Sequence, residues 1–279
     1  MLPHWPQLPK RSKKERFLEQ TVSALVHPGS DAFPRGSASG WSQMWHAMKD
    51  SRGSYYKTQV AGPITLFGKF HGSGSKGAQK LLESISLWLR HAYWQIEEIK
   101  DHGLKPILVL DEPLLPTFMG PLGSERAKRT LKLLRSIVKR LRRRGALVGV
   151  HCCNRISPSL LIDIGVDLIH FDAFYFPTQI IQAREELRRF MKDGGVVAWG
   201  IIPTNETLTS ELKGKLEKNF AGILEFMESR NLPLKSVLAQ SMISPTCGTG
   251  FLTVDQNEKI VDFANSLSLE MKKRYKLGK

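Results

Sequence analysis

The sequence is short of cysteine, of acidic residues and of long apolar runs, and each shortage excludes a class of protein. Three cysteines are too few, and odd in number, for a disulfide framework, and neighbours such as Cys152 and Cys153 are badly placed to bridge each other. No apolar run approaches the roughly 18 residues that cross a bilayer, and the N-terminal residues have no apolar core of the signal-peptide type. We therefore expect a soluble cytoplasmic protein with reduced or metal-bound thiols. P-loop, GxGxxG and nucleophile-elbow motifs are also absent.

The shortage of acidic residues is concentrated in one segment of a chain whose formal net charge is +15. Between Ser124 and Arg144 the only acid is Glu125, and apolar residues recur every three or four positions, which predicts an amphipathic helix with a cationic outer face. The cationic residues of this segment are Arg126, Lys128, Arg129, Lys132, Arg135, Lys139, Arg140, Arg142, Arg143 and Arg144. The face is either a solvated surface or a docking surface for an acidic partner. Since no nucleic-acid-binding signature accompanies it, nucleic acid is not the expected partner.

Short apolar runs alternate along the chain with longer stretches of helical spacing. The runs expected to form strands are residues 59–68, 106–113, 146–153, 166–174, 196–203 and 238–248. Helical spacing is found from Leu81, over residues 124–144 and from Ile223, whereas residues 27–40 and 71–77 read as loops. Such alternation is typical of parallel strands joined by crossover helices, an α/β fold. A chain of 279 residues is long enough for one β/α barrel, so we expect residues 1–279 to form a single domain.

Polar side chains follow the expected strands at their carboxyl ends. They are Asp111 and Glu112, His151 to Cys153, Asp172, Thr204 and Asn205, and Cys247. In a β/α barrel these ends form one face, and that face carries the chemistry. Residues nearly a hundred positions apart in the chain can therefore meet there.

The segment His151-Cys152-Cys153 is the strongest candidate for a metal site. Alternate side chains of an extended strand point the same way, so His151 and Cys153 can share a target while Cys152 faces elsewhere. Cys247 would supply a second thiolate, and Asp172 an oxygen ligand or a partner of a ligand. Such a set favours tetrahedral zinc with one open position. The alternative is that the cysteines are inert core residues.

The segments GPITL, LDEP, GVHCCN, VDLIHFDAF and SPTCG resemble, in their order and approximate spacing, the catalytic half of cobalamin-independent methionine synthase and its shorter relatives. The resemblance implies a TIM-type (β/α)8 barrel in which zinc binds the sulfur of homocysteine. It implies His151, Cys153, Asp172 and Cys247 as the zinc ligands, with Asp172 at a position where glutamate usually stands. The family's first strand has no counterpart, and WPQLP at residues 5–9 looks like its second strand. We therefore expect a barrel that lacks the family's first strand and helix.

The resemblance also implies a substrate site. Asp111 matches the aspartate that holds the amino group of the amino-acid substrate, so it is the expected catalytic and substrate-binding residue, and Glu112 completes the same motif. The expected function is a zinc-dependent methyltransferase that transfers a methyl group to a thiol. Homocysteine is the favoured acceptor, giving methionine, and the donor is a methyl-corrinoid, such as methylcobalamin or a corrinoid protein, or a methyl-folate.

Other functions stay open at this point. One is a methyl-corrinoid:coenzyme M-type methyltransferase, which shares the zinc chemistry. Another is an enzyme like uroporphyrinogen decarboxylase, which needs no zinc. A third is a non-catalytic binding partner built on a degenerate barrel, for which the basic helix would be the docking surface.

Overall fold

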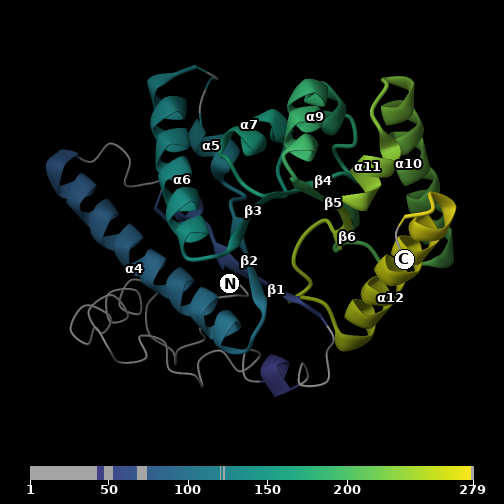
Figure 1. Cartoon of the computed structure of the whole chain (residues 1–279), viewed down its shortest axis with the longest axis horizontal. Coiled ribbons are helices and arrows are strands. Elements are labelled where there is room, and N and C mark those ends of the chain that lie inside the picture. The colour runs from purple at the N-terminus through teal and green to yellow at the C-terminus, as the bar shows by residue number, and fades with distance from the viewer. Residues whose placement is uncertain (1–42, 47–52, 68–73, 120, 122, 278–279) are drawn as a thin grey trace. The chain divides into compact units, whose positions relative to one another are not determined.

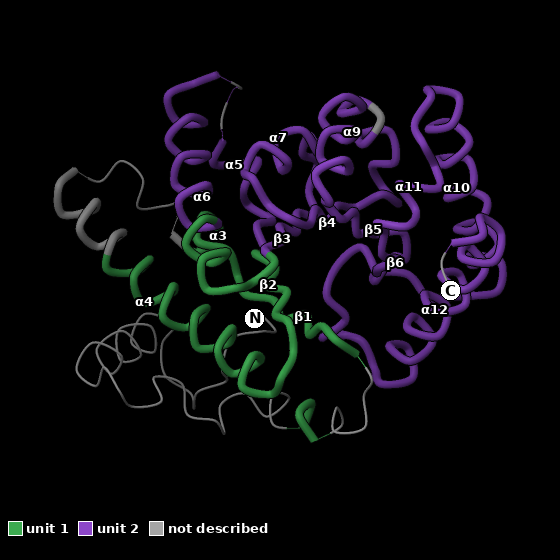
Figure 2. Tube along the Cα trace, viewed as in Figure 1, with its two compact units in different colours: residues 1–110, 139–147 green, residues 111–138, 148–279 purple. Residues whose placement is uncertain are grey.

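The computed structural model describes residues 43–46, 53–67, 74–119, 121 and 123–277 of the chain (Figure 1). It divides the chain into two compact units, which are coloured green and purple in Figure 2. Unit 1 comprises Met1–Leu110 and Lys139–Leu147, and unit 2 comprises Asp111–Val138 and Val148–Lys279. The expectation of a single barrel domain over residues 1–279 stays a prediction. The segments at residues 5–9 and 27–40 lie outside the described residues.

Unit 1 contains two strands and a long helix. Strand β1 (Tyr55–Ala61) alternates exposed and buried side chains, as a strand does when one face is covered, and β2 (Lys105–Asp111) is apolar and buried over most of its length. Helix α4 (Gly74–Asp101) is tied to β1 by Trp88, whose Nε1 donates to the carbonyl of Ala61 at 2.8 Å. The sequence predicts a loop at residues 71–77. This prediction is wrong from Gly74 onward, because α4 begins at that residue.

The expected strand at residues 59–68 is only partly correct. Strand β1 ends at Ala61, and Pro63–Phe67 form the short helix α3. Proline suits the first position of a helix because its fixed φ matches the helical value and its missing N–H would have no partner there. The amide of Leu66 donates to the carbonyl of Gly62 at 3.0 Å and so closes the helical turn.

Unit 2 contains the parallel sheet. Its strands are β3 (Leu147–Cys152, from Val148 onward in this unit), β4 (Leu168–Asp172), β5 (Val196–Ile202) and β6 (Ser241–Pro245). Each strand pairs in parallel with the next, β3 with β4, β4 with β5 and β5 with β6. The helices are α5 (Leu115–Met119), α6 (Glu125–Arg143, shared with unit 1), α7 (Pro158–Asp163), α8 (Gln179–Gln182), α9 (Arg184–Lys192), α10 (Ser210–Ser229), α11 (Leu234–Ala239) and α12 (Val254–Arg274). Strands and helices alternate, so the expected α/β fold with parallel strands is confirmed.

The core of unit 2 is centred on Trp199 of β5. Its ring packs edge-on against Phe171 of β4 at 5.6 Å and against Phe220 of α10 at 5.7 Å, and all three side chains are almost fully buried. Buried aromatic rings of this size dominate core energetics. The indole nitrogen donates to Ser241 Oγ at 2.9 Å, which satisfies its one polar group. These contacts join β4, β5, β6 and α10. Since β3 to β6 are parallel, their carboxyl ends share one edge.

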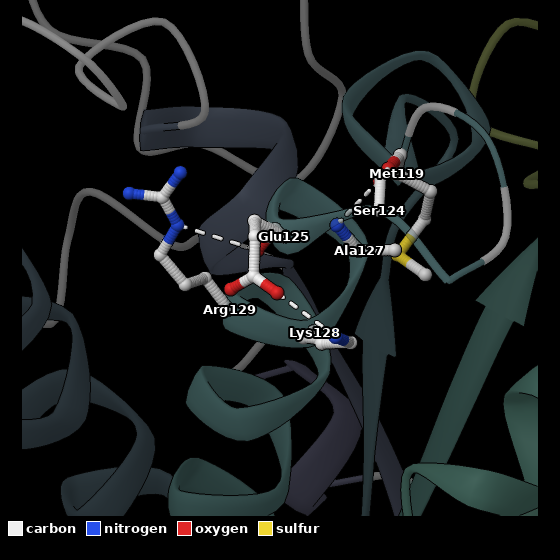
Figure 3. Close-up of polar contacts among 6 residues, drawn as sticks. All are labelled: Met119, Ser124, Glu125, Ala127, Lys128 and Arg129. Carbon is white, nitrogen blue, oxygen red and sulfur yellow. Dashed lines mark hydrogen bonds and ion pairs between the residues drawn. The ribbon is translucent and has the colours of Figure 1, made fainter.

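Helix α6 carries the cationic face that the sequence predicts. Figure 3 shows its first turn: Ser124 Oγ accepts from the amide of Ala127 at 3.1 Å and caps the helix, while Glu125 pairs with Lys128 at 2.8 Å. An acid in the first turn also suits the positive end of the helix dipole. The apolar residues on the inner side are buried: Ala127, Leu134, Ile137, Val138 and Leu141. The ten basic residues expected on the outer face are all exposed.

Across the ranges that the structure describes, no helix combines the length and the apolar character needed to cross a membrane.

Candidate metal centre

Three of the expected metal ligands lie together in unit 2. One ligand atom from each of His151, Cys153 and Cys247 lies within 4.8 Å of the other two. His151 is the penultimate residue of β3, Cys153 follows that strand, and Cys247 comes two residues after β6. Because the strands are parallel, their carboxyl ends lie at the same edge, which explains how residues so far apart in the chain meet. This His/Cys/Cys group could hold a metal ion.

The spacing of the three ligand atoms fits a metal site of ordinary size. Zinc–sulfur and zinc–nitrogen bonds of about 2.3 and 2.0 Å in a tetrahedron separate ligand atoms by roughly 3.5 to 3.8 Å. Ligand atoms that already lie within 4.8 Å of one another would need to close by only about 1 Å. Rotation of the two cysteine side chains supplies a movement of that size without a change in the backbone.

The His151 imidazole is buried and unsatisfied. Its side chain is 1% exposed, and neither ring nitrogen has a hydrogen-bond partner among the described residues. The Asp111 Oδ1 atom lies 3.8 Å from Nε2, which is beyond hydrogen-bonding distance. A buried polar group without a partner costs about 1 to 3 kcal/mol, and such groups in native proteins usually have an explanation. Coordination of a metal ion by one of these nitrogens would satisfy the ring.

The two thiols of the cluster differ in acidity. The Cys153 thiol, which can donate to the Cys247 sulfur, and the nearby His151 ring lower the pKa of Cys247 to about 4 against the opposing effect of burial. The same interaction, followed by burial, raises the pKa of Cys153 well above its usual value. Cys247 is therefore the more acidic of the two thiols. Thiolate sulfur and neutral imidazole are the donors that zinc prefers.

Cys152 is not part of the group of three, as expected for the residue between two ligands on one strand. It is fully buried, and its sulfur lies 3.6 Å from the carbonyl oxygen of Asn154. Burial raises the pKa of this thiol to about 12. Of the two adjacent cysteines, Cys152 is therefore a core residue and Cys153 belongs to the candidate site.

The predicted substrate residues Asp111 and Glu112 lie beside the cluster but in different environments. The side chain of Asp111, at the end of β2, is 25% exposed, so a ligand can reach it. Glu112 is completely buried, and its amide donates to the carbonyl of His151 at 2.8 Å. The side chain of Asn154 donates to the carbonyl of Pro113 at 2.7 Å. These two hydrogen bonds fix the segment after β2 against the end of β3.

Asp172 does not join the group of three ligands. It is the last residue of β4, and its Oδ1 accepts from the amide of Tyr175 at 2.7 Å. Burial raises the pKa of its carboxyl, although hydrogen bonds from the amides of Tyr175 and Phe174 and the charge of nearby His151 oppose the shift. Its role as a fourth ligand stays a prediction.

The aromatic residues Trp199, within β5, and Tyr175, after β4, have separate roles. Trp199 is a core residue and does not line the site. Tyr175 is half exposed, and its hydroxyl contacts Asn205 at 3.0 Å and Glu206 at 3.1 Å. This contact joins the segments that follow β4 and β5.

His170 is not among the site residues that the sequence predicts. His170 is 5% exposed and lies opposite His151 in the pairing of β3 with β4. The two rings are in contact, with centroids 4.2 Å apart and planes inclined by 40°. A histidine inside the apolar run LIHF was the available signal, because buried histidines need polar partners.

Comparison with known proteins adds no relative: no protein-family model matches the chain, and no curated protein matches it.

Proposed function

We propose that the protein is a zinc-dependent methyltransferase that transfers a methyl group to a thiol, with homocysteine as the favoured acceptor and methionine as the product. The observation that carries the proposal is the convergence of His151, Cys153 and Cys247 at the carboxyl ends of parallel strands. A set of two sulfurs and one imidazole leaves one position of a tetrahedral ion open, which is the catalytic arrangement of zinc. The proposal includes a barrel of the TIM (β/α)8 type and membership of the cobalamin-independent methionine synthase family, which the sequence motifs suggest.

In this proposal the chain's own residues bind the ion and orient the substrate. His151, Cys153 and Cys247 would hold zinc, and Asp172 would act as a fourth ligand or orient one of the three. Zinc in that position would keep a substrate thiol ionised near pH 7, although the pKa of a free thiol is about 8.5. The partly exposed carboxylate of Asp111 would bind the ammonium group of the acceptor, because the two charges are opposite and the carboxylate is reachable.

Two alternatives are less well supported by the cluster. A coenzyme M-type methyltransferase would use the same metal ligands but would have no need for Asp111 as an ammonium anchor. A decarboxylase of the uroporphyrinogen type needs neither thiol, so the pairing of Cys153 with Cys247 disfavours it. The donor that we favour is a methyl-corrinoid, either free or on an acidic carrier protein that docks on the exposed cationic face of α6.

The test is metal analysis followed by an activity screen. Protein purified without chelators is expected to contain about one zinc per chain, and to methylate homocysteine faster than coenzyme M with methylcobalamin as donor. Cys153→Ala and Cys247→Ala should lose both zinc and activity. Cys152→Ala is the matched control, since it removes a neighbouring sulfur that faces the core, and should keep both. Wild-type protein without zinc, or a fully active Cys247→Ala variant, would refute the proposal.

A further inference from the structure

His170 lies between the two segments that supply the proposed metal ligands. It is in β4, next to β3, which carries His151, and two strands away from β6, which is followed by Cys247 (Figure 1). Its ring contacts the His151 ring at a centroid distance of 4.2 Å. On its other side, Nε2 lies 3.1 Å from the carbonyl oxygen of Pro245. A carbonyl can only accept, so Nε2 carries the proton and donates it.

This hydrogen bond crosses an intervening strand. Neighbouring strands lie about 4.8 Å apart, so a side chain on β4 reaches β6 only by passing over β5. The residue of β5 at the crossing is Gly200, and a Cβ there would lie 3.3 Å from His170 Nε2 and 3.1 Å from the Cα of Thr246. The missing side chain of Gly200 therefore leaves the space in which His170 approaches β6.

The two contacts act on both ligand-bearing segments. Contact with the His170 ring limits the orientation of the His151 ring. Pro245 lies two residues before Cys247, and the amide of Thr246 donates to the carbonyl of Ile202 at 2.8 Å. The backbone before Cys247 is thus held on both sides, by His170 and by the end of β5.

We propose that His170 is a positioning residue that fixes the His151 ring and the Pro245–Cys247 segment relative to each other, so that the three ligand atoms are placed for metal binding. This role of His170 rests on the proposed function only for the presence of a metal. The placement of the two thiols can be measured without a metal and does not depend on the proposed function.

Two substitutions separate the contacts that His170 makes. His170→Phe keeps a ring against His151 but has no donor for the Pro245 carbonyl. His170→Gln keeps a donor that can reach this carbonyl but has no ring. Phe171→Leu is the matched control, because Phe171 is buried in the same strand and packs on Trp199 instead of on the cluster. It reports the effect of a core substitution in β4 by itself.

The first measurement is zinc affinity, by competition with a chromophoric chelator, together with the absorption spectrum of the cobalt(II)-substituted protein. Residues that orient metal ligands typically change affinity by about 10- to 100-fold. We expect His170→Phe to weaken zinc binding by at least about tenfold and to alter the sulfur-to-cobalt charge-transfer band. His170→Gln should recover most of the affinity, and Phe171→Leu should bind zinc like the wild type.

The second measurement uses metal-free protein and the rate at which diamide oxidises Cys153 and Cys247 to a disulfide. In this reaction the two thiols lose two electrons and two protons, and diamide is reduced to the hydrazine. His170→Phe should slow the reaction relative to the wild type, because the two sulfurs are no longer held together, whereas Phe171→Leu should not.

The two measurements distinguish failure of the inference from failure of the proposed function. If the wild type binds no zinc but His170→Phe slows disulfide formation, the proposed function is wrong and the positioning role stands. If folded His170→Phe matches the wild type in zinc affinity, cobalt spectrum and disulfide rate, the positioning role is overturned and the proposed function stands. Equal effects of His170→Phe and Phe171→Leu would also overturn it, since they would reflect general destabilisation of β4.

Discussion

Replacing Gly200 by alanine is expected to damage both the fold and the metal centre. An added Cβ would lie 2.6 Å from the carbonyl oxygen of Phe171, 3.1 Å from the Cα of Thr246 and 3.3 Å from His170 Nε2. The first of these contacts is with backbone and lies well inside van der Waals distance, so a strand has to move. Overpacking of this kind typically costs about 1 to 3 kcal/mol. Because β4 and the start of the Cys247 loop are the groups displaced, the cluster should lose its alignment.

The assay combines urea unfolding, followed by circular dichroism, with zinc affinity. We expect Gly200→Ala to lower the free energy of unfolding by about 1 to 3 kcal/mol and to weaken zinc binding about tenfold or more. The control is Gly222→Ala in α10, an exposed position where an added Cβ meets nothing within 4 Å. There alanine should stabilise the protein by about 0.5 to 1 kcal/mol, because glycine is a poor helix former, and should leave zinc affinity unchanged.

Two results would refute this reasoning in different ways. Unchanged stability in Gly200→Ala would show that β4, β5 and the Thr246 segment do not approach as closely as the structure indicates. Lower stability with unchanged zinc affinity would show that the packing around Gly200 does not align the ligands, and would contradict the role of His170 as well.

Two further predictions concern other parts of the chain. Burial lowers the pKa of His91 to about 4, whereas an unfolded histidine titrates near 6.5. The stability that neutral His91 contributes is therefore present above about pH 6.5 and is lost as the pH falls toward 4, so the unfolding free energy of the wild type should drop by up to about 3 kcal/mol across this range. A His91→Gln variant that shows the same drop would contradict this prediction. On α6, the Arg129→Glu/Lys132→Glu variant should bind fluorescent polyglutamate, a mimic of an acidic carrier, about tenfold more weakly at low salt than the wild type. A Lys272→Glu/Lys273→Glu control in α12 should differ little, and equal losses in the two variants would show that binding depends only on net charge.

The His91 prediction also has a geometric basis within unit 1. Thr58 Oγ1 donates to Gln95 Oε1 at 2.6 Å, which leaves the Gln95 amide nitrogen to face His91 Nε2 at 2.8 Å. That nitrogen is a donor, so His91 Nε2 accepts and the ring is neutral. Protonation would place two donors against each other and break the chain of hydrogen bonds.

Most strands of unit 2 could be predicted because each is a short apolar run with turn residues at its ends. The prediction at residues 238–248 was wrong at its start, because Leu238 and Ala239 belong to α11 and β6 is Ser241–Pro245. The run at residues 196–203 became β5, Val196–Ile202, almost without change. The run at residues 59–68 was misleading because an apolar pattern of that length does not separate a strand from a strand followed by one helical turn. Pro63 was the residue that marked the change, since it suits a helix start.

The candidate ligands could be predicted, whereas their supports could not. His151 and Cys153 were recognisable because both can bind a metal ion and because two residues separated by one position at a strand end point the same way. His170 was not, because its importance depends on pairing with β3 and on a carbonyl 75 residues further along the chain. Gly200 gives even less signal, since only the structure shows which atoms a side chain would meet there. In each case the missing information is the register between strands.

The unsatisfied imidazole of His151 connects the stability of unit 2 to its proposed chemistry. A core that only needed to be filled would gain from an apolar residue at this position, because a buried ring nitrogen without a partner costs about 1 to 3 kcal/mol. Next to it, Cys152 shows that the same strand can bury a sulfur in the core, with a pKa raised to about 12. Cys153 and Cys247 instead hold a shared proton beside the His151 ring, at an edge where a ligand can arrive. An imidazole without a hydrogen bond beside two thiols that share a proton is better explained by metal binding than by core packing, because an ion would satisfy the nitrogen and stabilise the thiolates together.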